Sequence, residues 1–418
     1  MSSYDERLMR RPPARLWLIR LLALLVSMVA SLAAVELAFR VFWLKRLTIV
    51  SGIEHPVFHH RPKPHTTYHY QTKEFDVTIT TNRYGLRGPD PVLPKPAGVT
   101  RILMLGDSFT FGYPVRDDET FCHLIEAGLR AKGLRAEVVN GGVSGYSPTL
   151  SYLSLREEFL TFEPDLVVLW FDLGDVADDN NFQRNLRYDA QSHLLGADPR
   201  YLDGHFSYWQ WAVDHSALAR WLNNKPLLTL QKMQILGVGG YLRAVARGER
   251  AKFAIARLRA EQGGPDAGKG DRFVLVRSWS TVERVQPAWA ASEKYLRLIH
   301  ELLAARKIPF ILGVYPYGMN AGPDEWEKGR RFWGFEAGKT YDYRVAQAVY
   351  RRFSQAEHVP LVDTFDDFRT AAASTDAKLF FAHDGHLTPA GHRVLAQHTL
   401  KDPQFIELVR RLGKRRAP

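Results

Sequence analysis

The chain has 418 residues, 45% of them apolar and 24% charged, a composition that is typical of globular proteins and excludes general disorder. Its single cysteine, Cys122, excludes an intramolecular disulfide and any site built from several cysteines. The net charge of +11 belongs to the two ends, because residues 1–46 hold eight Lys/Arg against three Asp/Glu and residues 401–418 hold six against two. The 42 basic and 40 acidic residues between them nearly cancel, so a nucleic-acid-binding core is not expected.

An apolar run near the N-terminus predicts a membrane anchor. Residues 21–39 carry one charge, Glu36, and flanking apolar residues extend the run over residues 16–44. At about 1.5 Å per residue, a helix over residues 21–39 alone is just long enough to span a hydrocarbon core of about 30 Å. Glu36 and Arg40 are spaced to pair on one face of that helix. A cleaved signal peptide, for which the run is long, and a buried core helix are the alternatives.

The charges around this run predict its orientation. Five Arg precede it and three Lys/Arg follow it, an excess that favours a cytoplasmic N-terminus. Residues 47–418 then lie outside the cytoplasm, a compartment that suits a chain with one cysteine.

Residues 50–72 are rich in His, Pro and aromatic residues without periodicity, which predicts a linker close to the membrane. No helical or hairpin register groups their histidines with carboxylates, so a metal site is not expected there. The histidines are His55, His59, His60, His65 and His69. Residues 75–81 alternate like a strand, and residues 82–85 form a turn after it.

From residue 99 onward, short apolar strands alternate with amphipathic helices. Strands are expected over residues 101–105, 136–139, 165–170, 309–314 and 359–362. Helices are expected over residues 120–132, 147–160, 288–305, 341–353 and 388–400. This alternation predicts an α/β fold, a doubly wound parallel sheet with helices on both faces.

A long insertion interrupts the alternation and completes the division of the chain. The expected segments are 1–46 (cytoplasmic N-terminus and anchor), 47–98 (linker and leading strand), 99–177 (first part of the α/β domain), 178–282 (insertion) and 283–418 (second part, with a basic tail). The insertion is too long for an ordinary loop and contains Trp209, Trp211 and Trp221. Residues 227–260 look helical, and residues 217–260 hold nine Lys/Arg and one acid. Either the insertion is a lid or a surface for anionic lipid or a partner, or it is a solvated helical segment.

Three short segments carry residues typical of nucleophilic catalysis. The first ends the strand at 101–105 in a small-residue turn that places Ser108 at the strand's carboxyl end, where open α/β sheets bind ligands. There Ser108 can expose its hydroxyl and offer its own N–H to an oxyanion. The alternative is an ordinary turn in which Asp107 or Ser108 only caps a helix.

The second and third segments complete the set. Residues 138–145 end the next strand with consecutive glycines, which let backbone N–H groups approach a ligand closely, but they lack the G-x-G-x-x-G order of a dinucleotide site. In the third, Asp384 lies two residues before His386, directly ahead of a helix. An Asp so placed can orient the imidazole, which can then take the proton of a serine. A turn with a capping Asp and a surface His is the alternative.

In this order, Gly106-Asp107-Ser108, Asn140–Gly145 and Asp384-Gly385-His386 resemble the motifs of the SGNH (GDSL) hydrolases, over residues 101–400. Residues 81–88 resemble the segment before the catalytic domain in membrane-anchored bacterial members. The Asp-x-His spacing resembles the branch that acts in polysaccharide acetylation, including alginate acetylation proteins.

The resemblance implies a flavodoxin-like three-layer fold and ester chemistry. It makes Ser108 the nucleophile, His386 the general base and Asp384 the acid that orients it. The N–H groups of Ser108 and Gly142 become oxyanion donors. The residues expected nearest to substrate are Asp107, Asn140 and Asp175.

One stretch departs from the family's pattern, which has an Asn side chain as a third oxyanion donor after the third strand. The best alignment puts Gly174 in its place, followed by Asp175. Glycine has no side-chain donor and an ionised Asp cannot donate, and losing one such donor costs on the order of 3–4 kcal/mol in a hydrolase. Asn180, Asn181 or a backbone N–H could substitute, or the site is tuned for transfer or has degenerated.

We therefore expect a membrane-anchored serine esterase that acts on O-acyl esters, in particular O-acetyl groups of an extracytoplasmic glycan. The expected location is the bacterial inner membrane, with one span and a periplasmic catalytic domain. An O-acyltransferase that moves an acyl group to a polysaccharide, with a membrane-bound acyl donor protein as its partner, is the first alternative. A non-catalytic scaffold is the second. No cofactor, metal ion or nucleic acid is expected.

Overall fold

The computed structural model describes residues 14–42, 53–199, 216–222, 228–246 and 269–414. Contacts divide the chain into two compact units, one formed by residues 1–49 and 204–231 and the other by residues 50–203 and 232–418. Two tryptophans of the insertion, Trp209 and Trp211, lie outside the described residues. The part of its basic stretch beyond residue 246 does too.

The first unit contains the apolar helix α1 (Ala14–Phe42) and the short helix α7 (Ala217–Leu222). The part of α1 from Arg15 to Ala38 is long and apolar enough to cross a membrane, a property that signal sequences share. The predicted pair is present, because Arg40 Nε donates to Glu36 at 2.8 Å. Glu36 also accepts from the Ser216 hydroxyl at 2.7 Å and the Leu218 N–H at 3.0 Å, which joins α7 to the end of α1.

The second unit is built on a parallel five-stranded sheet in the order β11-β10-β7-β5-β6. Its strands are β5 (Thr100–Gly106), β6 (Ala136–Gly142), β7 (Leu166–Phe171), β10 (Phe310–Val314) and β11 (Leu361–Asp363). Counted along the chain, the spatial order is 2-1-3-4-5, the flavodoxin-like arrangement that was predicted. In that arrangement the order reverses between β5 and β7, and ligands bind at the carboxyl ends of those two strands.

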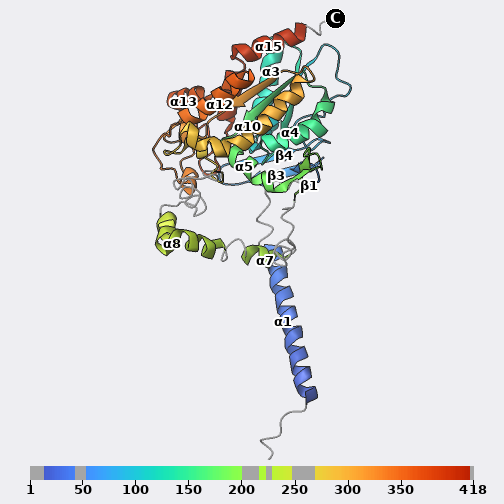
Figure 1. Cartoon of the computed structure of the whole chain (residues 1–418), viewed down its shortest axis with the longest axis vertical. Helices are drawn as coiled ribbons and strands as arrows, with labels where there is room; N and C mark the ends of the chain where they lie inside the picture. Colours follow the sequence, from blue (N-terminus) through green and yellow to red (C-terminus); the bar gives the residue numbers. More distant parts are fainter. Residues whose placement is uncertain (1–13, 43–52, 200–215, 223–227, 247–268, 415–418) are drawn as a thin grey trace, which may run out of the picture. The chain divides into compact units, whose positions relative to one another are not determined.

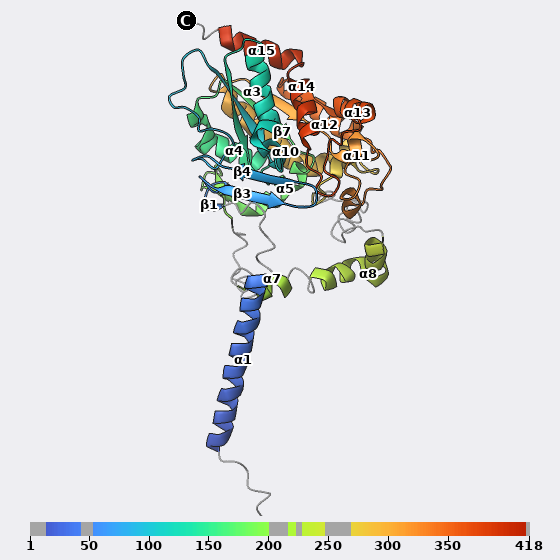
Figure 2. The same ribbon diagram turned by 180° about the vertical axis from the view of Figure 1, so that it is seen from behind.

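Helices cover both faces of this sheet, as the α/β alternation predicted. On the face seen in Figure 1, α10 (Val282–Ala304) packs against α4 (Pro148–Glu157) and α5 (Asp175–Phe182). On the face seen in Figure 2, α14 (Pro389–Thr399) packs against α3 (Phe121–Ala131). The other helices of this part are α2 (Ser108–Phe111), α11 (Gly318–Ala321), α12 (Arg344–Glu357), α13 (Phe365–Ser374) and α15 (Pro403–Lys414).

Polar side chains precede the helices α3, α14 and α4, where they can accept from the free N–H groups of the first turn. Thr120 caps α3 by accepting from the His123 N–H, and Thr388 caps α14 by accepting from the Gly391 N–H. Ser147 precedes α4 as predicted, but its hydroxyl makes no cap and donates to the buried carboxylate of Asp179 at 2.5 Å. Asp179 also accepts from Thr149 on α4 and from Ser292 on α10, so it ties three helices together. Ser147 is thus the N-cap residue of α4, with its hydroxyl bonded to this buried acceptor and not to a helix N–H.

The segment before the sheet is more ordered than the predicted linker. It contains strands β1 (Ile53–His55), β2 (His59–Arg61), β3 (Thr67–Gln71) and β4 (Asp76–Thr80), of which only the last was expected. β3 and β4 form an antiparallel hairpin whose Tyr70, Val77 and Ile79 pack against Phe111 of α2. The alternating pattern that would predict β3 is hidden because its inward positions are tyrosines and its outward positions include a histidine.

The described parts of the insertion include both strand and helix. β8 (Leu186–Tyr188) pairs with β9 (Leu194–Ala197), and α8 (Leu228–Ala246) falls within the predicted helical stretch. α8 breaks at Gly237, where φ is +68°, as the glycines there predicted.

Candidate active site

The nucleophile candidate lies on a tight turn at the carboxyl end of β5. Gly106 needs to be glycine, because a Cβ there would lie 2.2 Å from Thr110 Oγ1 and 2.9 Å from the Trp170 carbonyl oxygen. The Asp107 carboxylate accepts from the Phe109 N–H at 2.8 Å and caps α2. Ser108 therefore begins α2, where its N–H has no carbonyl partner inside the helix.

His386 and Asp384 meet Ser108 at this turn. His386 Nε2 lies 2.8 Å from Ser108 Oγ, and His386 Nδ1 lies 2.5 Å from Asp384 Oδ1. With the imidazole proton on Nδ1 donated to Asp384, Nε2 is left to accept the proton of the serine hydroxyl. Tertiary structure thus brings together two residues whose positions in the chain differ by 278.

The charges within this trio favour a base and its orienting acid. Burial alone would lower the pKa of His386, but the charge of Asp384 and its hydrogen bond raise it above the ordinary value of 6.5. Burial would raise the pKa of Asp384, yet His386 holds it below its ordinary value. Asp384 is therefore the ionised partner and His386 the group that gains and loses the proton.

The loop that carries Asp384 is held by a residue that sequence reasoning missed. Glu74, in the β3–β4 turn, accepts from the N–H groups of His383 at 2.9 Å and Asp384 at 3.0 Å. The next residue, Phe75, packs edge-on against Phe381, with ring centres 5.3 Å apart. The sequence holds no local signal for this contact, because the partners are more than three hundred residues apart.

A second missed residue, Arg87, supports the turn after α2. Its side chain is almost fully buried and donates to the carbonyl oxygens of Gly112 at 2.6 Å and Val115 at 2.9 Å. It also pairs with Asp117, which keeps its buried charge compensated. Arg87 thus joins the segment 81–88 to the turn that follows α2.

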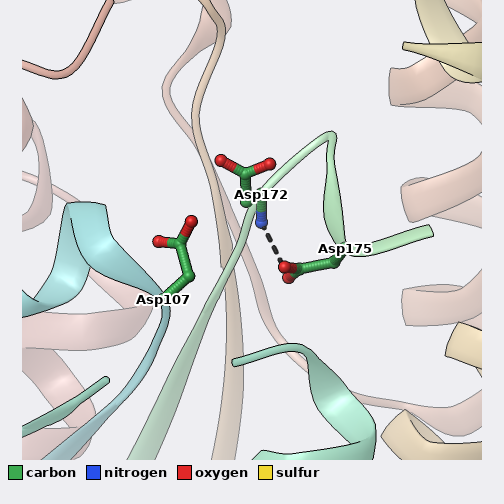
Figure 3. Close-up of side chains that lie close together, drawn as sticks. All are labelled: Asp107, Asp172 and Asp175. Atoms are coloured by element: carbon green, nitrogen blue, oxygen red, sulfur yellow. Dashed lines mark hydrogen bonds between the residues drawn. The ribbon is translucent and has the colours of Figure 1, made fainter. Parts of the chain in front are cut away.

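Three buried carboxylates lie beside the nucleophile turn, at the ends of β5 and β7 (Figure 3). Oxygens of Asp107, Asp172 and Asp175 lie within 4.8 Å of one another, a spacing that a cation could bridge. The Asp172 N–H donates to Asp175 at 3.0 Å, the bond drawn in Figure 3. Burial raises the pKa of Asp107 to about 8 and that of Asp175 well above its ordinary value, and the neighbouring carboxylates add to both shifts.

Hydroxyl donors from the next strand loop stabilise this cluster. The Tyr315 hydroxyl donates to Asp107 at 3.1 Å, and the Tyr317 hydroxyl donates to Asp172 at 2.8 Å. Because burial and neighbouring carboxylates raise the pKa of both Asp107 and Asp175, the cluster carries less negative charge than three free carboxylates would. We therefore describe it as a hydrogen-bonded group of acids that supports the turn.

The residues predicted to bind substrate are part of this support. Asp107, Asn140 and Asp175 are 2%, 7% and 1% exposed, and each is bonded within the protein. Polar side chains this buried are held by internal partners, and contact of these three with substrate stays a prediction.

The two predicted oxyanion glycines also have engaged N–H groups. The Gly142 N–H donates to Asn140 Oδ1 at 3.0 Å, and the Gly174 N–H donates to Asp172 Oδ1. Gly142 is needed for another reason, because a Cβ there would lie 2.3 Å from the Phe111 nitrogen of α2. Of the three expected oxyanion donors, the Ser108 N–H is the one at a helix start with no carbonyl partner inside the helix.

The asparagines proposed as substitutes lie elsewhere. The Asn180 amide donates to the carbonyl oxygens of Val176 and Ala288, each at 2.7 Å, and Asn181 is exposed. The side chain that covers Gly174 is Arg272, from the end of the insertion. Its Nε would lie 2.1 Å from a Cβ on Gly174.

Comparisons with known proteins return solved structures of esterases. No protein-family model and no curated protein sequence matches the chain. A member of the lipolytic protein G-D-S-L family from Veillonella parvula is 13% identical, with 73% of this chain and 98% of that chain covered and a TM-score of 0.35. The acetyl xylan esterase AlAXEase is 14% identical, with 72% and 97% covered and a TM-score of 0.34. A two-domain esterase active on acetylated mannans is 11% identical, with 77% and 51% covered and a TM-score of 0.36.

In this chain the three motifs lie at the carboxyl ends of β5 and β6 and directly before α14.

Proposed function

We propose that the chain is a serine esterase that acts on O-acyl esters through Ser108, His386 and Asp384. The observation that carries the proposal is the hydrogen-bonded series from Ser108 Oγ to His386 Nε2 and from His386 Nδ1 to Asp384. A serine hydroxyl paired with an imidazole that is oriented by a carboxylate is the arrangement that activates serine for acyl transfer.

The steps follow from these contacts. Ser108 Oγ attacks the acyl carbonyl carbon while its proton passes to His386 Nε2, and a tetrahedral oxyanion forms. His386 returns that proton to the oxygen of the leaving alcohol as the ester bond breaks, which leaves an acyl group on Ser108. Water then attacks the acyl-enzyme with His386 as base, and the carboxylic acid and free serine are released.

The substrate class that we propose is an O-acetylated glycan. The motif resemblance implies it through the Asp-x-His spacing, and acetyl esters are therefore the first compounds to test. Transfer of the acyl group to a sugar hydroxyl is the second candidate, because Gly174 and Arg272 alter the side of the site where hydrolases stabilise the oxyanion. Adding an unacetylated glycan acceptor separates the two, since acylated glycan forms only by transfer.

The test uses the full-length protein in detergent and an aryl acetate. Ser108→Ala and His386→Ala should each lower turnover by as much as about 10⁶-fold, the loss that serine hydrolases show without these groups. Ser144→Ala, which removes the serine of the neighbouring glycine loop, should keep turnover and is the matched control. A fluorophosphonate should label the wild type and fail to label Ser108→Ala. Unchanged hydrolysis by Ser108→Ala would overturn the proposal, and absence of both labelling and turnover in the wild type would favour a scaffold.

We further propose that α1 anchors the chain in the inner membrane, with the catalytic unit on the periplasmic side. The support is the apolar helix between Arg15 and Ala38 and the excess of Arg before it. An alkaline phosphatase fusion placed after the catalytic unit should be active in cells. An inactive fusion alongside an active cytoplasmic reporter would reverse the orientation, and release of the protein from membranes would indicate a cleaved signal sequence.

A further inference from the structure

The oxyanion side of Ser108 needs another donor if the site cleaves esters. An acyl-transfer site stabilises its tetrahedral oxyanion with preorganised donors, and removing one of them costs about 10²–10³ in turnover. Here the N–H groups of Gly142 and Gly174 already donate to Asn140 and Asp172. Among the described residues, Ser108 therefore supplies one backbone donor, and the other donors must be side chains or amides that change partner.

Arg272 lies over Gly174, the position at which the pattern of the SGNH (GDSL) hydrolases has the asparagine donor. A Cβ on Gly174 would be 2.1 Å from Arg272 Nε and 2.6 Å from Asp172 Oδ1, so the guanidinium occupies the space that a side chain at position 174 would fill. The backbone of Gly174, with φ −74° and ψ −22°, suits any residue. The space at position 174 is limited by the side chains of Arg272 and Asp172 and not by the backbone conformation.

The guanidinium is held in place but has unused donors. Arg272 Nη2 donates to Asp178, one turn along α5 from Gly174, at 2.9 Å. Nε is buried and has no hydrogen-bond partner among the described residues. A buried donor without a partner costs free energy, and such groups persist where a ligand completes them. The side chain as a whole is 32% exposed, so a solvent-borne ligand can approach the rest of the group.

The charges around Arg272 keep it cationic. Burial would lower its pKa, but Asp178 first, and then Tyr317, Asp172 and Asp107, raise it well above the ordinary value. Asp172 lies beside Gly174 and Arg272, and its carboxylate is within 4.8 Å of that of Asp107, the residue directly before Ser108. A fixed cation beside the nucleophile turn attracts a developing oxyanion.

We propose that Arg272 is a catalytic residue whose guanidinium donates to the oxyanion of the tetrahedral intermediate, in place of an asparagine at position 174. This rests on the proposed ester chemistry at Ser108. The insertion thus contributes to catalysis through Arg272, near its end. Gly174 and Arg272 together take the place of a single asparagine at position 174.

The experiment substitutes Gly174 and Arg272, singly and together, in the full-length protein. Arg272→Ala should lower kcat for an aryl acetate by about 10²-fold, with a much smaller change in KM, because the lost contact forms only in the transition state. Gly174→Asn alone should also lower activity, because its side chain meets Arg272. The double variant Gly174→Asn with Arg272→Ala loses the arginine contact, and the Asp172 side chain has to shift for the amide to fit. We expect its kcat to rise at least about tenfold above that of Arg272→Ala.

Two controls separate this inference from the proposed function. Arg284→Gln removes an exposed positive charge from the start of α10 and should leave kcat unchanged. Ser108→Ala reports on the ester chemistry itself. If Ser108→Ala is inactive while Arg272→Ala retains kcat within about threefold of the wild type, the role of Arg272 is wrong and the esterase proposal stands. If Arg272→Ala is inactive and the double variant gains nothing while both keep the wild-type melting temperature, the donor role is also overturned, because a replacement donor would have restored turnover.

Discussion

The two sides of Ser108 are built in different ways. On the base side, His386 and Asp384 lie two residues apart on one loop and reach the serine through bonds of 2.8 and 2.5 Å. On the oxyanion side, the expected glycine amides are engaged, and the group over Gly174 is an arginine nearly a hundred residues further along the chain. A short motif can therefore identify the base side, whereas the oxyanion side depends on which distant segment fills a gap.

On the base side, a change at Asp384 is expected to cause a large loss of turnover. Asp384→Asn keeps the shape of the side chain but removes the charge that raises the pKa of His386, and it favours the wrong tautomer of the imidazole. Turnover should fall on the order of 10⁴-fold, the loss seen for the same exchange in a serine protease.

The pH profile makes the test of Asp384 specific. His386 must be neutral to act as base, so wild-type kcat/KM should rise with pH through a midpoint above 6.5. In Asp384→Asn the residual activity should rise through a lower midpoint, because the charged imidazole has lost its partner. An unchanged midpoint would mean that another group controls the base.

On the other side, Gly142→Ala tests whether that glycine is needed for packing. The new methyl group would lie 2.3 Å from the Phe111 nitrogen and 2.6 Å from the Thr110 carbonyl carbon, so α2 has to move. We expect a loss of about 1–3 kcal/mol in the free energy of unfolding together with a marked loss of turnover. Denaturant unfolding measures the first and an aryl acetate assay the second. Gly270→Ala, where a Cβ meets nothing within 4 Å, is the control and should change neither.

A smaller effect is expected from Glu74, which supports the base side from the leading hairpin. Glu74→Gln leaves one acceptor for the two N–H groups of His383 and Asp384, so the loop that carries the acid should be less well held. We expect kcat to fall severalfold with KM unchanged and with the melting temperature nearly constant. Asp76→Asn, on the same hairpin and exposed, is the matched control. Equal kcat values for the two variants would remove Glu74 from the positioning of Asp384.

The smallest effect concerns the acids beside the oxyanion side. Burial, with Asp172 and Asp107, raises the pKa of Asp175 well above 3.8, so the folded protein holds a proton that the unfolded chain releases. The free energy of unfolding should therefore decrease as pH rises from 3.8, the ordinary pKa of an Asp side chain, toward the raised pKa of Asp175. Asp175→Asn cannot ionise and should lose less stability between about pH 5 and about pH 8. Thermal unfolding at both pH values tests this, and equal slopes for the variant and wild type would show that Asp175 does not titrate there.

Much of the fold could be predicted because its signals are local. Apolar strands such as β7 and β10 are buried on both faces and appear in the sequence as continuous apolar runs. The Thr-Pro pair before α14 marks its start within one residue. Strand β3 was missed because its residues alternate tyrosine with polar side chains. The bond from the Ser147 hydroxyl to Asp179 has no local signal, because the two residues are 32 positions apart.

The apolar helix near the N-terminus, the α/β alternation and the short motifs around Ser108 and His386 could be predicted from sequence, because each depends on neighbours a few positions away. The contact of Glu74 with the acid loop, the burial of Asp107, Asn140 and Asp175, and the position of Arg272 over Gly174 appear only in the folded chain. These contacts join segments whose separation along the chain carries no pattern, and they form only when burial and close packing select one arrangement.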